Sequence, residues 1–274
     1  MYNLVEVTHR FQAINTEVET IICLPEREQQ TGRRILERAE LMFRIIENTL
    51  NRFSPDSELS TLNDSAGFPV KANSLLFDAV TAALKAARQT RGAYDPVAAD
   101  FDNRSIKYAQ GMRWQDINLD PAASTINLMP GCRLNLDDIS KSWAIDQVSE
   151  ILSYSAGYAI DAGGEPWNIG IVDPRQTNRN IQTLELKSGA ICTSVPRLHL
   201  WCNSAADRSA QIISATVLAA SAVQAKTLSK AAITLGHRKG LDLLEKLSGV
   251  SGLLVLEDGQ LLISHAFPEP VKAA

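Results

Sequence analysis

The stretch NTEVETIICLPEREQQTGRRILERAELMFRIIENTL, residues 15–50, changes its hydrophobic period in the middle. Its first part, Asn15 to Leu24, is rich in β-branched residues and stops at Pro25, which predicts a strand. Apolar residues then recur every three or four positions, which predicts a long amphipathic helix from about Gln29 to Leu50. A strand therefore leads directly into a helix.

The sequence on the C-terminal side of this stretch also predicts a mixture of strands and helices. A second helix is predicted over about Ser74 to Thr90, with Gly92 near its end, and a third from Asp137 or Asp138 as N-cap through Leu152. A fourth is predicted over Ala222 to Leu235 with Gly236 as its stop, and a fifth around Leu241, Leu244 and Leu247. Short strands are predicted at Tyr158 to Asp161, Asn168 to Val172, Ile181 to Leu186 and Ile212 to Leu218, and a final hairpin turns at Asp258-Gly259.

These strands and helices alternate without regular βαβ spacing, so the pattern favours the α+β class, with mixed or antiparallel sheets and packed helices. The 274 residues suffice for one large domain or two small ones. We expect a domain over residues 1–266, either undivided or as two closely packed subdomains. The remainder, 267–274, is expected to be a flexible tail.

Composition and charge exclude several classes of function. The net charge of −4 gives no electrostatic reason to bind nucleic acid or an anionic membrane. The longest apolar runs are far shorter than the roughly 20 residues of a transmembrane helix. The N-terminus shows neither the pattern of a signal peptide nor a lipid-accepting cysteine, so we expect a cytoplasmic protein.

The four cysteines and four histidines are scattered through the chain. Neither the CxxC pairs of a zinc knuckle nor the HxxxH or HExxH spacing of a histidine metal site occurs. Buried free thiols are the expected state of the cysteines.

Three polar stretches are candidates for chemistry, and each has a structural alternative. RFSPDSELSTLN, residues 52–63, contains a turn in which Ser57 or Ser60 caps the next segment. LNLDDISKSWAID, residues 134–146, brings Lys141 to a helix start that either holds a phosphate or is only structural. IDAGGEPW, residues 160–167, is either a tight turn or a close backbone approach to a ligand.

Two common site types are rejected. The paired glycines at 163 and 164 lack the third glycine and the subsequent helix of a dinucleotide-binding fingerprint. No GxSxG elbow is present, so acyl transfer has no nucleophile motif.

Taken in order, these stretches resemble the ApbE-type flavin transferase family. Its F-x-A-M-G-T start is similar to residues 11–16, and F-x-x-D-S-E-[IL]-S-x-L-N is matched in full at 53–63. G-A-[FY]-D-P is matched at 92–96, and D-L-G-G-I-A-K-G-Y-A-x-D is similar to 135–146. A-G-G-D resembles 162–165, W-x-[VI]-G-I-x-D-P is present at 167–174, and T-S occurs at 193–194.

The resemblance implies a T-fold-like α+β architecture, FAD as donor substrate, and magnesium-dependent transfer of FMN to a threonine of an acceptor protein. It places Ile14, Phe53, Ala93, Tyr94, Asp95, Asn135 and Lys141 along the flavin, with Glu165, Thr193, Ser194, Lys226 and Lys230 as further binding positions. The rings of Phe53 and Tyr94 suit packing on a flavin, and Lys141 suits contact with its diphosphate.

Departures from the family pattern fall on its cation-binding parts. The family's Asp and Thr, four residues apart on a helix, are Lys226 and Lys230 here, and an ammonium has no lone pair for a cation. Of the family's H-I-[IV]-D-P-x-T-G block only Asp207 is recognisable, and two glycines before the third helix are Asp137 and Asp138. We therefore expect the magnesium site to be lost.

The two lysines allow two interpretations. They either lie on a solvated helix face or pair with Asp137 or Asp138 in place of the metal. The sequence thus predicts a degenerate ApbE-type transferase with impaired metal-dependent catalysis. The alternatives are a flavin- or nucleotide-binding protein without catalysis and a scaffold for a protein partner.

Overall fold

The chain folds into two units, and each unit has its own sheets and helices. A computed structural model describes residues 3–97, 112–162, 169–184, 186, 188–196 and 211–269. The first unit comprises Met1–Lys85 and Asp95–Gly163, and the second comprises Ala86–Tyr94 and Gly164–Ala274. None of the helices within the described ranges is long and apolar enough to cross a membrane.

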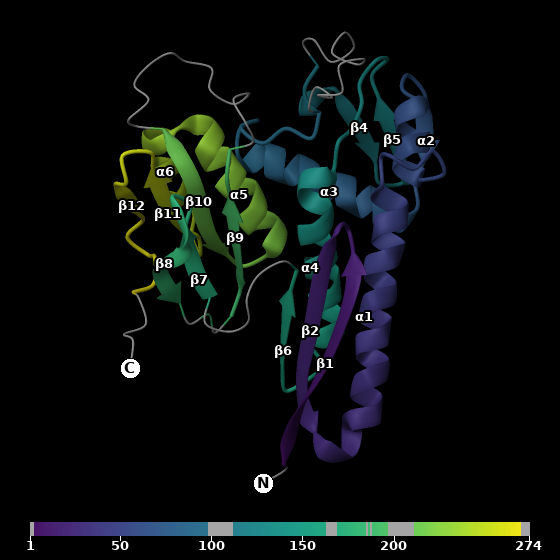
Figure 1. Ribbon diagram of the computed structural model, residues 1–274. Helices are drawn as coiled ribbons and strands as arrows, with labels where there is room; N and C mark the ends of the chain where they lie inside the picture. The colour runs from purple at the N-terminus through teal and green to yellow at the C-terminus, as the bar shows by residue number, and fades with distance from the viewer. Residues whose placement is uncertain are drawn as a thin grey trace. The chain divides into compact units, whose positions relative to one another are not determined.

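The first unit is organised around a hairpin and a long helix. Strands β1 (Leu4–Ala13) and β2 (Thr16–Pro25) form an antiparallel pair, and β6 (Gly157–Asp161) joins the other edge of β2. After the short helix η1 (Glu26–Glu28), helix α1 (Gln29–Leu50) lies alongside the hairpin (Figure 1). The predicted strand and helix are confirmed, whereas β1 is an additional strand that the sequence pattern did not reveal.

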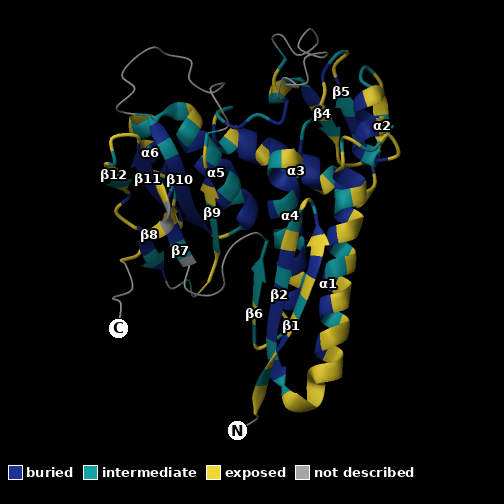
Figure 2. Ribbon diagram, in the orientation of Figure 1, coloured by how far each residue is buried: buried dark blue, intermediate teal, exposed yellow. Residues whose placement is uncertain are grey.

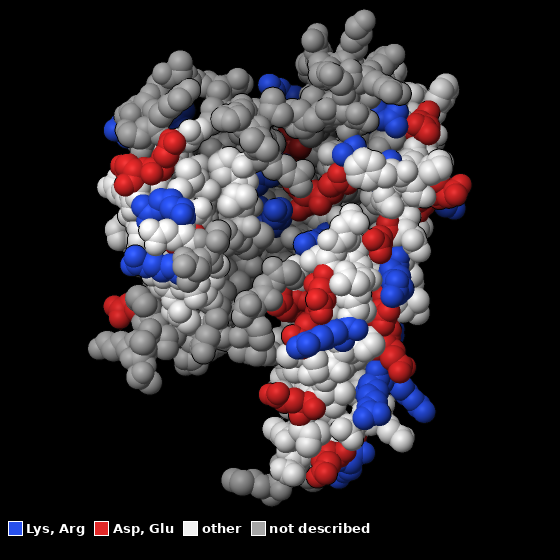
Figure 3. Space-filling model, viewed as in Figure 1, with Lys and Arg blue, Asp and Glu red and all other residues white. Residues whose placement is uncertain are grey.

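Burial of one side of α1 explains its length. Leu36, Ala39, Phe43, Ile46 and Leu50 are buried at helical spacing, and the opposite side is exposed (Figure 2). The Phe43 ring meets Phe11 of β1 edge-on at 5.4 Å between centroids. Acidic and basic side chains alternate along the exposed side of α1 in Figure 3, as expected for a solvated helix face.

The remaining elements of the first unit are shorter. Helix α2 (Glu58–Asp64) precedes a sheet of order β3-β5-β4, formed by β3 (Pro69–Lys71), β4 (Ile117–Asp120) and β5 (Thr125–Leu128). Helices α3 (Ser74–Gln89), η2 (Trp114–Asp116) and α4 (Asp137–Leu152) complete it, and the last turn of α3 belongs to the second unit. The predicted stop near Gly92 is confirmed: α3 ends at Gln89, and Gly92 follows with φ +80 and donates to the Ala87 carbonyl.

The second unit contains a four-stranded antiparallel sheet of order β12-β11-β10-β9. Its strands are β9 (Ala190–Ser194), β10 (Ile212–Ala219), β11 (Ser251–Leu256) and β12 (Leu261–Ile263), and β7 (Ile169–Asp173) pairs with β8 (Gln176–Leu184). Helices α5 (Ala222–Leu235) and α6 (His237–Glu245) cover one face, with the β7–β8 hairpin on the other (Figure 1).

This two-sided cover explains why residues on both faces of β10 are buried. Val217 packs towards α5 and α6, while Leu218 packs in the cluster that contains Ile171 of β7. Gly236 ends α5 with φ +77, and Gly259 turns the last hairpin with φ +92, both as predicted. In the predicted tail, Phe267 is buried in the cluster of Ile171, and residues 270–274 lie outside the described part.

Candidate functional site

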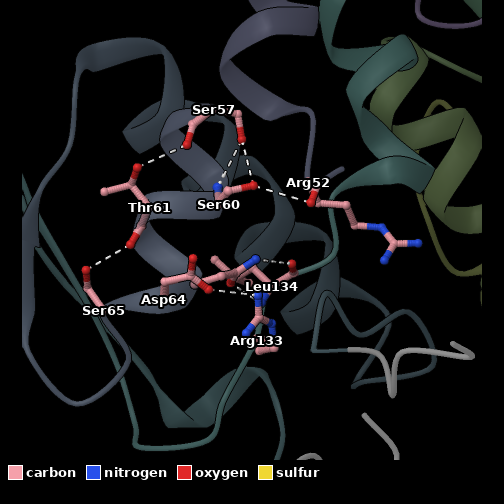
Figure 4. A network of polar contacts seen from close by, with 9 residues as sticks. Arg52, Ser57, Ser60, Thr61, Asp64, Ser65, Arg133 and Leu134 are labelled. Carbon is pink, nitrogen blue, oxygen red and sulfur yellow. Dashed lines mark hydrogen bonds and ion pairs between the residues drawn. The ribbon is translucent and has the colours of Figure 1, made fainter. Parts of the chain in front are cut away.

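The polar block at residues 52–63 forms the start of α2 in the first unit. Ser57 is the N-cap and accepts a hydrogen bond from the Ser60 amide at 3.0 Å. The Ser60 hydroxyl in turn donates to the Arg52 carbonyl, and Figure 4 shows the Arg52 guanidinium pointing away from these serines. The predicted cap is confirmed, but the segment that it caps is a helix and not only a turn.

Asn63, the last residue of this block, joins it to the segment before α4. Its side-chain amide donates to the Leu134 carbonyl at 3.0 Å and accepts from the Leu134 amide at 2.7 Å. Asn63 is buried, so both ends of its amide are satisfied inside the protein. Two of the stretches that carry the family resemblance are thus bound together.

Arg52 makes a second connection between the same stretches. Its Nε donates to Oδ2 of Asp137 at 2.6 Å, and its guanidinium lies 4.1 Å from the centroid of the Phe53 ring. Phe53 is 73% exposed, so a large aromatic surface is open beside this ion pair. Arg52 was not among the candidate residues, because its partner lies 85 positions away in the sequence.

The start of α4 differs from the prediction in its capping. Neither Asp137 nor Asp138 is the N-cap; that residue is Leu136, without a side-chain cap. The Asn135 side chain accepts from the Asp137 amide at 2.9 Å instead, while the Asp137 carboxylate pairs with Arg52. Lys141 in the first turns of α4 reaches the Ala162 carbonyl at 3.4 Å, which brings the second and third polar stretches together.

Asp95 is held by backbone amides. Its carboxylate accepts from the amides of Val97 at 2.9 Å and Trp114 at 3.3 Å. Burial raises the pKa of Asp95, and these two amides partly oppose the shift. Nearby, burial and then the charges of Asp116 and Asp95 raise the pKa of Cys132 to about 11, so this buried free thiol stays protonated.

Ile14 occupies the turn between β1 and β2. It has φ +48 and is followed by Asn15 with φ +56, a left-handed conformation that is strained for a β-branched residue. Its amide donates to Oε1 of Glu47 at 3.0 Å. Glu47 was missed as a site residue because no local pattern links it to Ile14.

In the second unit, four of the predicted site residues form two separate pairs. Lys226 donates to the Ser194 hydroxyl at 3.5 Å, and that hydroxyl is 2.8 Å from Ser229. The Lys230 ammonium lies 6.0 Å from the centroid of the Tyr94 ring. Both lysines are half-buried, and whether they serve a ligand stays a prediction.

Other predicted residues have less defined surroundings. Thr193 pairs with Thr216 across β9 and β10 through their hydroxyls at 2.9 Å, and Ala93 follows the end of α3. Glu165 and Asp207 lie outside the described residues. Pairing of the lysines with Asp137 or Asp138 would join residues of different units and stays a prediction.

Comparisons with known proteins agree with the resemblance. The sequence model of the ApbE family matches residues 14–254. A search of curated proteins finds no match. Among solved structures, the chain is similar to the ApbE protein from Thermotoga maritima, with 21% identity, a TM-score of 0.78 and coverage of 95% of this chain and 97% of that one.

Two flavin transferases are similar to a comparable degree. ApbE from Vibrio cholerae has 18% identity and a TM-score of 0.77, with 97% of this chain and 99% of that chain covered. ApbE from Pseudomonas stutzeri, described as a flavinyl transferase, has 18% identity and a TM-score of 0.74, with 97% and 96% covered. These likenesses show that the chain has the ApbE fold.

Proposed function

Because the chain belongs to the ApbE family, we propose that it binds FAD as a flavin transferase homologue whose metal-dependent transfer step is impaired. The observation that carries this proposal is the presence of Lys226 and Lys230 where the family pattern has metal ligands. Family membership supports the flavin ligand, and the lysines support the loss of metal dependence.

The first unit supplies groups that suit a flavin nucleotide. Phe53 offers an exposed ring for stacking, and Arg52 beside it keeps one face of that ring covered by a cation. Lys141 lies at the start of α4, where a helix N-terminus favours an anion. In this unit we assign Phe53 to the flavin ring and Lys141 to the phosphates.

The divalent metal that the family resemblance implies does not fit the residues at 226 and 230. Magnesium requires oxygen ligands in near-octahedral geometry, whereas lysine ammonium groups only donate hydrogen bonds and repel a cation. We therefore derive no catalytic step through a metal.

The transfer reaction shows what is lost without that ion. A threonine hydroxyl oxygen of the acceptor forms a bond to the FMN phosphorus, the bond from this phosphorus to AMP breaks, and the hydroxyl proton is released. Negative charge develops on the phosphoryl oxygens and on the leaving AMP, and a metal ion stabilises such charge by several kcal/mol. Two ammonium groups neutralise a bound diphosphate but do not coordinate the attacking and leaving oxygens. Binding is expected to persist while transfer slows.

Binding and transfer are tested separately. FAD binding is measured by quenching of flavin fluorescence, and AMP release by chromatography, each with magnesium and with EDTA. We expect FAD to bind in EDTA and AMP to be released much more slowly than the roughly 1 per second of ordinary enzymes. Magnesium-stimulated release at that rate would overturn the impaired step, whereas absence of FAD binding would leave the protein-partner scaffold as the function.

A further inference from the structure

Arg52 links a carboxylate to an exposed aromatic ring in the first unit. Its Nε donates to Oδ2 of Asp137 at 2.6 Å, and its guanidinium carbon lies 4.1 Å from the centroid of the Phe53 ring. The side chains of Arg52 and Asp137 are 21% and 35% exposed, whereas Phe53 is 73% exposed. One guanidinium group is therefore held by a carboxylate and lies against a ring that is mostly open to solvent.

Local hydrogen bonds fix the backbone at both residues of this ion pair. The Ser60 hydroxyl donates to the Arg52 carbonyl at 3.3 Å, and the Asp137 amide donates to the Asn135 side chain at 2.9 Å. An exposed ion pair contributes little when two long side chains have to be ordered for it, but a short side chain on a fixed backbone loses less freedom. The Asp137 carboxylate thus gives the guanidinium a defined place over the Phe53 ring.

A second ion pair of the same type lies nearby. Arg133 donates to Oδ1 of Asp64 at 3.1 Å, and the side chains of Arg133 and Asp64 are 48% and 69% exposed. Asp64 ends α2 and Arg133 precedes α4, so this pair also joins the two stretches that Arg52 connects (Figure 4). It is a matched control for Arg52 and Asp137, because it links the same parts of the chain and is more exposed.

The position of the Phe53 ring matters for any ligand that stacks on it. A free aromatic side chain at the surface samples several rotamers, and fixing one of them on binding lowers affinity by about two- to ten-fold. A guanidinium over the ring face is favourable by cation–π attraction and by planar stacking, and it restricts the ring before a ligand arrives. Because Arg52 lies on one face of the ring, the other face is the one that a planar ligand covers.

We propose that Arg52 and Asp137 are positioning residues that hold the Phe53 ring for a planar aromatic ligand. The ligand stacks on the ring face that Arg52 leaves open, and Asp137 acts through Arg52 by orienting its guanidinium. Identifying the ligand as a flavin rests on the proposed function. The family pattern has glycine in place of Asp137, so this support of the ring belongs to this chain.

Riboflavin tests the ring contact by itself, because it carries the flavin ring without a phosphate. Its affinity and that of FAD are measured by fluorescence quenching in EDTA. Asp137→Asn removes the charge at nearly constant size and is expected to weaken the binding of both flavins by the same factor of about two to ten. Asp137→Glu keeps the carboxylate and is expected to recover part of the loss. Asp64→Asn, which breaks the control ion pair, is expected to leave both affinities unchanged.

A double-variant cycle shows whether Asp137 acts through the ring. Phe53→Leu removes the stacking surface, and Asp137→Asn is then added to it. If Asp137 positions the ring, the second change has no further effect on flavin affinity once the ring is gone. An ion pair that only stabilises the fold would change affinity equally, or not at all, in both backgrounds. Circular dichroism of each variant shows whether the fold is kept.

The outcomes separate the positioning role from the proposed function. If wild type and Asp137→Asn bind both flavins equally, the proposed function stands and the positioning role is wrong. If only FAD affinity changes, Asp137 acts on the phosphates and the positioning role is again wrong. If neither flavin binds to wild type, the proposed function is wrong, and urea unfolding of the same cycle decides the positioning role. The two changes must then alter the unfolding constant non-additively, by at least about two-fold, and additive effects overturn the role.

Discussion

The backbone amide of Ile14, in the turn between β1 and β2, donates a hydrogen bond of 3.0 Å to the carboxylate of Glu47 on α1. The turn lies towards the C-terminal end of α1, so the helix fixes the tip of the hairpin (Figure 1). Ile14 is one of the residues that the family resemblance assigns to the flavin site. Glu47 thereby supports a left-handed backbone conformation at a predicted binding position.

Replacing Glu47 by alanine is expected to destabilise the protein by about 1–2 kcal/mol, because a half-buried amide loses its acceptor. Glu47→Gln keeps an acceptor oxygen and is expected to cost less than about 0.5 kcal/mol. Urea unfolding of both variants measures the difference. Equal losses for alanine and glutamine would show that the carboxylate charge matters more than the hydrogen bond.

Ile14→Asn is expected to raise stability by about 0.5–1 kcal/mol, because asparagine tolerates the left-handed region in which a β-branched side chain is strained. The same urea assay applies. A decrease would mean that the packing of the isoleucine side chain outweighs its backbone strain.

Lys226→Asp combined with Lys230→Thr restores the residue types of the family pattern. We expect FAD affinity to become dependent on magnesium and to fall on addition of EDTA, because two oxygen ligands replace two ammonium groups. Transfer activity is not expected to return in full, since the family's histidine block is also missing. Calorimetry with and without magnesium measures the change, and metal-independent affinity in the double variant would contradict it.

The pH dependence of stability should reveal the ion pairs of Glu40. A hydrogen bond from His9 at 2.6 Å, followed by those from Arg44, lowers the pKa of the Glu40 carboxyl. A lowered folded-state pKa stabilises the protein above the unfolded value of about 4.3, and the gain is lost as the pH falls through the folded value. Wild type should exceed Glu40→Gln in stability at pH 7, and the difference should shrink in acid. A difference that stays constant with pH would exclude this origin.

Gly240→Ala is expected to destabilise the second unit by about 1–3 kcal/mol through overpacking. A Cβ at this position would lie 2.6 Å from the Ala232 carbonyl oxygen, where α6 approaches the backbone of α5. Helix propensity alone favours alanine by about 1 kcal/mol, so a net loss of stability in Gly240→Ala shows that the close contact outweighs the helix propensity. Gly157→Ala is the control, since its nearest neighbour is 3.9 Å away. Thermal unfolding measures both variants.

The sequence predicted the elements whose formation depends on neighbours along the chain. Helix α1 follows from its own apolar spacing, and the turns at Gly236 and Gly259 follow from the backbone freedom of glycine. The capping of α2 by Ser57 is equally local. In contrast, β1 was missed although Val7, Phe11 and Ala13 are buried on one face of the strand, because the polar residue His9 stands between them on that face and interrupts the apolar alternation.

By itself, the sequence determined the α+β class, the main helices and the ordered blocks by which the chain belongs to the ApbE family. Only the tertiary structure decided that Asp137 pairs with Arg52 across 85 positions, that Glu47 holds the Ile14 amide, and that serine hydroxyls orient Lys226. The physical reason is the distance along the sequence over which each effect acts. Propensity, period and capping act within a few residues, whereas the partner of a polar side chain depends on which elements pack together to bury their apolar faces.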